Sequence, residues 1–95
     1  MISVVKAEYM DGYKIYLEFN NGKTGEVDFK EIITRDHRPI FNQLKDISIF
    51  KNFKIDFDTI VWPNELDIAP EYLYFQAFKH DSKLSSQFRK WGYVN

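Results

Sequence analysis

The chain has 95 residues, which is enough for one hydrophobic core and too few for two. It contains no cysteine, so disulfides, thiolate zinc sites and cysteine nucleophiles are excluded and a reducing compartment is favoured. No stretch approaches the ~20 apolar residues of a membrane span, the N-terminus does not have the pattern of a signal peptide, and a net charge of −1 attracts phosphate backbones only weakly. We therefore expect a cytoplasmic protein that does not bind membranes.

Two turn signals divide the start of the chain into three strands. Residues 2–10 are rich in β-branched and aromatic side chains, and Asp11-Gly12 follows them as a tight hairpin turn. Residues 13–19 alternate between apolar and polar types, the pattern of a half-buried strand. Asn21-Gly22 gives a second hairpin turn before residues 23–29. The sequence therefore predicts a three-stranded antiparallel meander.

The middle of the chain predicts short helices and a second pair of strands. Residues 30–33 form a short helical turn, a polar loop follows, and an amphipathic helix begins at Pro39. Residues 53–57 alternate as a fourth strand, with a turn at Asp58-Thr59. Residues 60–62 form a short fifth strand that ends at Pro63, because proline has no N–H for the ladder.

The next predicted helix has an unusual apolar surface. Either Asp67 caps it or Pro70 takes its first position. Apolar side chains over residues 72–78 surround the axis and leave only Gln76 as a polar gap. A helix that is apolar all round must be buried on more than one side, and we predict a single α+β domain over residues 1–78 in which it packs.

The last residues predict a helical tail over residues 79–95, packed on the domain or on a partner. Asp81 can cap a helix, Gly92 can end it, and three apolar side chains share one face of it: Leu84, Phe88 and Trp91. The tail carries +3 and residues 1–78 carry −4. This split suits an arm that docks on an acidic surface, and ordinary scatter of surface charge produces it equally well.

A motif between the fifth strand and the long helix resembles a known family. The string is Trp62-Pro63-Asn64-Glu65-Leu66-Asp67-Ile68-Ala69-Pro70-Glu71-Tyr72-Leu73-Tyr74, and it is similar to the signature of the bacterial domain of unknown function 2442. Its key positions are Trp62, Pro63, Asn64, Asp67 and Pro70. The segment Phe19-Asn20-Asn21-Gly22 and the spacing of Phe41, Leu44 and Phe50 also resemble that family.

The resemblance implies a small α+β domain with an N-terminal antiparallel sheet. Some relatives are fused to a DNA-binding helix-turn-helix, and others are encoded beside a second small protein, in what have been suggested to be toxin–antitoxin-like pairs. The resemblance implies no catalytic residues. The residues after 78 are too few for a helix-turn-helix, so we do not expect DNA binding to carry over from the fused relatives.

Few residues point to catalysis or to a metal. Glu65, Asp67 and Glu71 could act as acid–base groups or hold a hard cation, whereas helix capping and the helix dipole explain Asp67 and Glu71 without any chemistry. His37 and His80 are the only histidines, too few for a zinc site without thiolates. We expect no catalytic centre, no cofactor and no metal.

Surface rings give the most specific functional prediction, a non-catalytic protein-interaction or regulatory module. Nine Phe, six Tyr and two Trp suit a small core and suit an interface equally, and rings clustered at a surface anchor interfaces. We expect Trp62 to lie in the core. The expected contact anchors are Tyr72, Tyr74, Phe78, Phe88 and Trp91.

Three other possibilities stay open at this point. The module could bind a second copy of itself, since a basic tail can pair with an acidic body. It could be a nucleic-acid adaptor, because rings interleave with the tail's cations, Lys79, Lys83, Arg89 and Lys90. It could be a small metal-dependent or acid–base enzyme that uses Glu65, Asp67 and Glu71.

Overall fold

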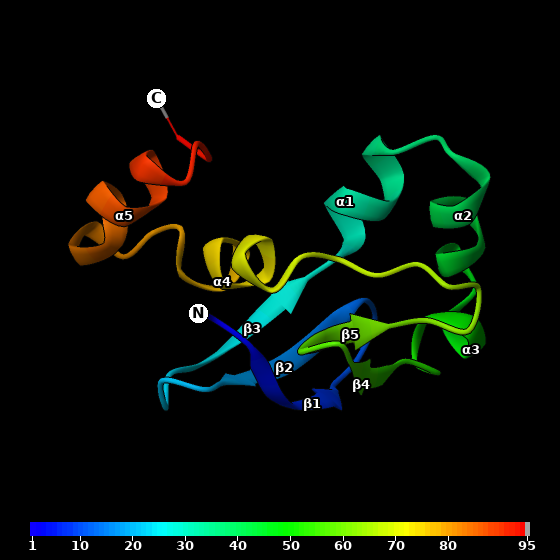
Figure 1. Ribbon diagram of the computed structural model, residues 1–95. Coiled ribbons are helices and arrows are strands. Elements are labelled where there is room, and N and C mark those ends of the chain that lie inside the picture. Colours follow the sequence, from blue (N-terminus) through cyan, green and yellow to red (C-terminus); the bar gives the residue numbers. More distant parts are fainter. Residues whose placement is uncertain (95) are drawn as a thin grey trace.

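The N-terminal meander is formed as expected. The computed structural model describes residues 1–94, and its first three strands are β1 (Val4–Tyr9), β2 (Lys14–Phe19) and β3 (Thr24–Asp28), antiparallel in the order β1-β2-β3 (Figure 1). Gly22 has a φ of +84° in the second turn, a conformation that glycine adopts without the clash of a Cβ. The two turn signals thus set the register of the sheet, in which Ile15 pairs with Tyr9 and Val27.

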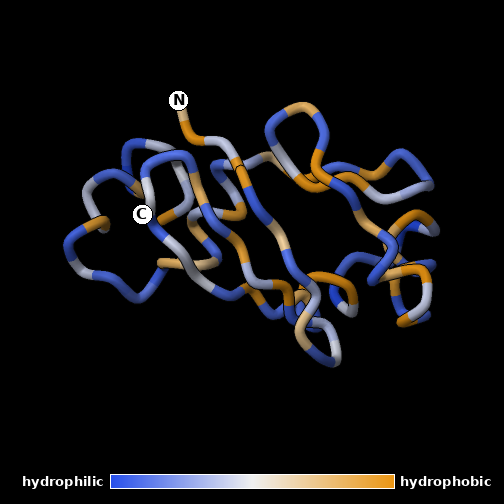
Figure 2. Tube along the Cα trace, turned by 90° about the horizontal axis from the view of Figure 1, so that it is seen from below, coloured by the Kyte–Doolittle hydropathy of each residue, from blue (hydrophilic) through white to orange (hydrophobic). Residues whose placement is uncertain are grey.

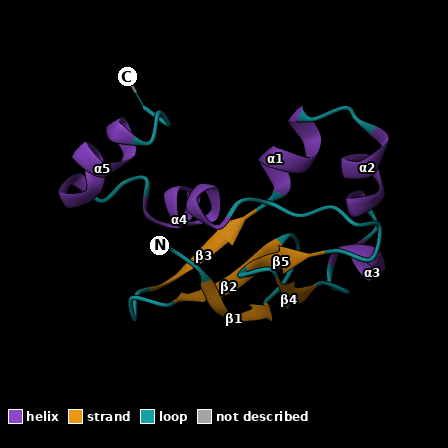
Figure 3. Cartoon of the chain, in the orientation of Figure 1, coloured by secondary structure: helices purple, strands orange, loops and turns teal. Residues whose placement is uncertain are grey.

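The meander has one core face and one solvent face. Ile15, Leu17 and Phe19 are buried, whereas Lys14, Tyr16 and Glu18 between them are partly exposed. Figure 2 shows apolar and polar residues alternating along the strands. Figure 3 shows most of the helices on one side of the sheet. The polar side chains between the buried ones, such as Lys14 and Glu18, are left partly exposed to solvent.

Short helices α1 (Lys30–Arg35), α2 (Pro39–Asn42) and α3 (Ile47–Phe50) follow the meander, with a 3₁₀ turn (Gln43–Lys45) between the last two. The predicted helical turn over residues 30–33 was too short. An ion pair between Glu31 and Arg35 supports two further residues, because positions i and i+4 are neighbours on a helix.

The second sheet is a two-stranded hairpin of β4 (Lys54–Asp56) and β5 (Thr59–Val61). The predicted turn at Asp58-Thr59 was displaced by one residue, since Phe57 and Asp58 occupy the turn with φ of +53° and +66°. Two consecutive positive φ angles define a type I′ turn, the two-residue turn that fits the twist of a hairpin. The displacement leaves Phe57 outside the strand, and 80% of it is exposed.

The long helix α4 (Pro70–Phe78) lies across the core face of β3. Pro70 is its first residue and Ala69 its N-cap, so the alternative in which Asp67 caps the helix was wrong. Asp67 instead pairs with Val61 beside β5. The approach of α4 is close at Gly25, where a Cβ would lie 3.1 Å from the Phe78 ring.

The tail forms a 3₁₀ turn (Ser82–Leu84) and α5 (Ser85–Lys90). Asp81 accepts a hydrogen bond from the Lys83 N–H at the start of the 3₁₀ turn, and Gly92 follows α5 with a φ of +86°. The buried side of α5 lies on α4, with the Phe88 and Phe75 ring centroids 5.1 Å apart. None of the helices within residues 1–94 is long and apolar enough to cross a membrane.

Candidate functional site

The structure divides the five expected contact anchors into buried and accessible residues. Tyr74 and Phe88 are 2% and 1% exposed, so the structure buries both of these expected contact anchors within the chain. Their rings meet at 6.1 Å between α4 and α5, and Tyr74 also packs edge-on against Phe19 of the sheet. The tail therefore covers part of the apolar circumference of α4, which removes these rings from any partner's reach.

Tyr72, Phe78 and Trp91 remain partly exposed. Trp91 rests on the Tyr74 ring at 6.0 Å, and the Lys23 ammonium lies 5.6 Å from the Phe78 ring centroid. The three residues thus contact other parts of their own chain and remain partly accessible to solvent. As contact residues they stay predictions.

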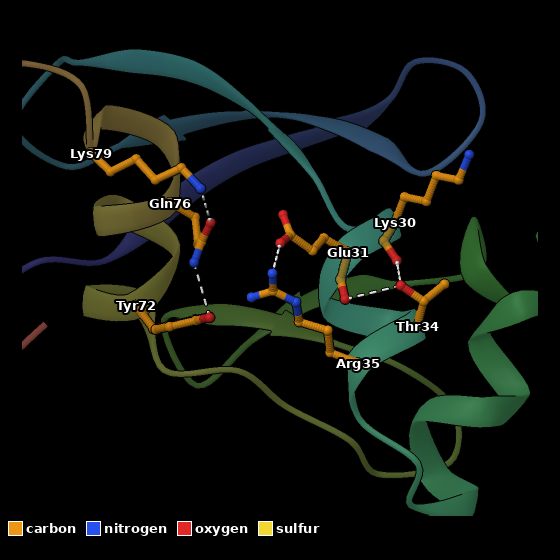
Figure 4. Close-up of polar contacts among 7 residues, drawn as sticks. All are labelled: Lys30, Glu31, Thr34, Arg35, Tyr72, Gln76 and Lys79. Atoms are coloured by element: carbon orange, nitrogen blue, oxygen red, sulfur yellow. Dashed lines mark hydrogen bonds and ion pairs between the residues drawn. The ribbon is translucent and has the colours of Figure 1, made fainter.

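A cleft of about 480 Å³ separates α1 from α4, and we call it the helix cleft. Figure 4 shows its two walls, with Glu31 and Arg35 on α1 and Tyr72, Gln76 and Lys79 on or next to α4. The Gln76 amide donates to the Tyr72 hydroxyl at 2.9 Å and accepts from the Lys79 ammonium at 3.2 Å. These polar groups are therefore hydrogen-bonded or ion-paired within their own wall.

Ion pairs compensate two of the three carboxylates that line the helix cleft, those of Glu31 and Asp36. Arg35 pairs with Glu31, and at the mouth Arg38 pairs with Asp36 at 2.7 Å. The hydrogen bond from Arg38 holds the pKa of Asp36 below its usual value, so this carboxylate stays ionised at neutral pH. A site for acid–base chemistry needs a group whose pKa is moved toward neutrality, and this shift runs the other way.

A second surface, which we call the hairpin groove, lies where the β4–β5 hairpin meets the motif of residues 62–74. It has a volume of about 350 Å³. Its lining comes from β4, the hairpin turn, β5 and the motif segment, and consists of Lys54, Asp56, Phe57, Val61, Trp62, Pro63, Glu65 and Asp67. The pairing of Val61 with Asp67 brings these two parts of the chain together.

Backbone strain is concentrated around the hairpin groove. Among residues 1–94, the non-glycine residues with positive φ are Phe57, Asp58 and Glu65, at +53°, +66° and +69°. Left-handed backbone costs a residue with a Cβ about 1–2 kcal/mol, and most of all a bulky one such as Phe57. Sequence reasoning missed this surface, because it placed the turn at Asp58-Thr59 and left Phe57 in the strand.

The motif residues form part of the groove lining, and hydrogen bonds hold them in place. Trp62 is in the core as expected, and its indole N–H donates to the Phe50 carbonyl at 2.6 Å. The Asn64 side chain donates to the Ile40 carbonyl at 3.1 Å and accepts from the Leu66 N–H at 3.2 Å. These bonds fix the segment on which Pro63 and Asp67 stand exposed.

The acidic residues of the motif do not converge. Over residues 1–94, no three histidine or carboxylate side chains come together in a way that could hold a metal ion, and Glu65, Asp67 and Glu71 are included in that statement. Glu71 belongs to the first turn of α4, where the helix dipole favours a carboxylate.

The architecture is that of a small α+β domain with its helices on one side of an antiparallel sheet. The chain belongs to the family described as "Protein of unknown function (DUF2442)", which it matches over residues 4–79. The resemblance of the chain to this family is thereby confirmed. No curated protein is similar enough to the chain to count as a match.

A solved structure shares the fold. It is a protein from Nitrosomonas europaea described as "Putative DNA Binding Protein", with 14% identity and a TM-score of 0.74. The likeness covers 100% of this chain and 63% of that one, so the common fold includes the tail, and the neighbour has further residues outside it.

Proposed function

We propose that the protein is a non-catalytic protein-interaction module and that the hairpin groove is its contact surface. The observation that carries the proposal is Phe57, a ring that is 80% exposed on a strained backbone at the rim of the groove. Strained residues persist where the surrounding structure holds them, and they cluster at binding sites.

The energetic argument compares Phe57 with the other rings. Phe19, Phe29 and Phe50 are buried and stabilise the fold, whereas Phe57 leaves most of its apolar surface in water. Burying a Phe side chain stabilises by about 1.5–3 kcal/mol. A partner that covers Phe57 would therefore gain binding free energy from a ring whose burial does not stabilise the fold. Aromatic anchors of this kind carry much of the affinity of protein interfaces. A small regulatory partner would agree with the toxin–antitoxin-like pairs that the family resemblance implies.

Affinity capture from the native cell tests the proposal with the full chain as bait. Phe57→Asn removes the ring and keeps a residue that tolerates positive φ. Met10→Asn is the matched control, because Met10 is an exposed apolar residue outside the groove lining. We expect a protein retained by the wild type and by Met10→Asn and lost with Phe57→Asn. Equal retention by all three baits would reject the groove as the contact surface.

Nucleic-acid binding is the second candidate, favoured by the description of the Nitrosomonas europaea neighbour. Four cations in the last part of the chain are exposed, namely Lys79, Lys83, Arg89 and Lys90. The proposal ranks below the first because Lys79 already bonds to Gln76 and because residues 1–78 carry −4. Gel shifts with mixed DNA and RNA at low salt, with Arg89→Glu as the paired variant, decide it. A shift that Arg89→Glu weakens would favour the adaptor.

A further inference from the structure

We infer that the hairpin groove takes a segment of another protein that presents a Lys or Arg side chain next to an apolar one. The inference rests on the proposed function, since it names the chemistry of the partner for that same surface. Two properties of the described lining carry it: an uncompensated negative charge and an apolar rim.

The charge comes from the composition of the lining. It contains three carboxylates, on Asp56, Glu65 and Asp67, and one ammonium, on Lys54. The Lys54 ammonium lies 3.9 Å from Asp56, which leaves Glu65 and Asp67, both exposed, as two negative charges at the opposite wall. A cation that enters the groove therefore meets complementary charge, which steers association and selects among partners.

The apolar part of the lining says what must accompany that cation. Phe57 and Pro63 are exposed, and Val61 in the same lining is partly exposed. An aliphatic or aromatic side chain can cover these surfaces, and a guanidinium can lie over the face of the Phe57 ring. A purely basic segment would leave Phe57 in water, and a purely apolar one would leave the two carboxylates without a partner.

The basic tail of a second copy fits the groove poorly. The exposed residues of its basic helix α5 are Ser85, Ser86, Arg89 and Lys90, which are polar, while its rings lie against α4. Moreover, the helix and the groove are different surfaces, so their contact would be head-to-tail and would build rings or filaments. These two facts favour a different protein.

The test uses an array of short peptides and the full chain. Each peptide carries Lys, Arg, Gln or Glu at one position and Leu, Phe or Ser at the neighbouring one. We expect binding to the peptides that combine Lys or Arg with Leu or Phe, and weaker binding as the salt concentration rises. Equal binding to the Glu or Gln peptides would overturn the inference.

Two variants separate this inference from the proposed function. Glu65→Gln/Asp67→Asn removes the two charges and keeps the shape, and we expect about tenfold weaker binding to the basic peptides. Phe57→Asn removes the ring. If Phe57→Asn abolishes binding and the double variant binds as the wild type does, the groove stands as a site and its charge preference is refuted. If Phe57→Asn binds normally too, the proposed function fails with it.

Light scattering tests whether the groove binds a second copy of the chain. A concentration-dependent rise in mass that the double variant abolishes would assign the groove to a second copy and overturn the inference.

Discussion

Replacing Phe88 by alanine tests whether the C-terminal tail is an integral part of the fold. The ring is 1% exposed and meets Phe75 edge-on at 5.1 Å. Truncation of a buried Phe to Ala costs about 3–5 kcal/mol, through lost burial and the cavity left behind. A small domain has about 5–15 kcal/mol of stability, so the Phe88→Ala protein keeps its fold with a reduced margin.

Urea unfolding followed by circular dichroism measures this loss. With an m-value of about 1–3 kcal/mol/M, the expected destabilisation lowers the midpoint by about 2 M. The stability lost in Phe88→Ala cannot exceed the free energy that holds the tail on α4. If the substitution cost more than that, the tail would detach and the sheet would stay folded. Amide hydrogen exchange detects that release as faster exchange confined to residues 82–94.

Arg89→Ala is the control, since Arg89 is exposed on the same helix. Its effect should stay within about 0.5 kcal/mol, as is usual for surface substitutions. A loss below about 1 kcal/mol for Phe88→Ala, with unchanged exchange in the tail, would refute the reasoning, because a buried ring between two helices cannot be removed at so small a cost.

Three further variants probe other parts of the chain. Phe57→Asn should change the unfolding free energy by less than about 1 kcal/mol, because the relief of backbone strain offsets the small buried area that the ring loses. Urea unfolding measures this change, and a loss above about 3 kcal/mol would mean that the ring packs against the rest of the protein. Gly25→Ala should destabilise the protein by about 1–3 kcal/mol, since its Cβ would lie 3.1 Å from the Phe78 ring; an unchanged melting temperature would contradict this. The pKa of Asp46 is lowered by its hydrogen bonds from Ser48, so the stability it contributes is present above its ordinary pKa of 3.8 and is lost as the pH falls through the lower folded-state pKa. The stability difference between wild type and Asp46→Ala should therefore shrink in acid, and a difference that is constant from pH 6 to pH 2 would count against the cap.

Local sequence signals predicted much of the fold. The turns at Asp11-Gly12 and Asn21-Gly22 and the alternation over residues 13–19 act between near neighbours, and the meander follows from them. The hairpin turn at Phe57-Asp58 was predicted one residue too late, at Asp58-Thr59. Its conformation depends on the pairing of β4 with β5 and on a hydrogen bond from the Val4 N–H to the Asp58 carbonyl, which joins distant parts of the chain.

The candidate site was predicted only in part. The motif drew attention to Pro63 and Asp67, which line the hairpin groove, but their partner Phe57 was assigned to a strand. Among the expected anchors, Tyr74 and Phe88 were chosen because their positions are apolar. Apolar spacing shows that a ring must be shielded from water, and it does not say whether another molecule or the same chain shields it.

The sequence by itself determined the family, the α+β class and the alternation of the strands, because these depend on residue type and on spacing along a few turns of chain. Only the tertiary structure decided that the tail covers α4 and that the exposed ring is Phe57. Both outcomes depend on contacts between residues far apart in the sequence, such as Phe75 with Phe88 and Val61 with Asp67. Burial is a property of such contacts and not of the local pattern, so the surface that a partner can reach becomes visible only when the chain is folded.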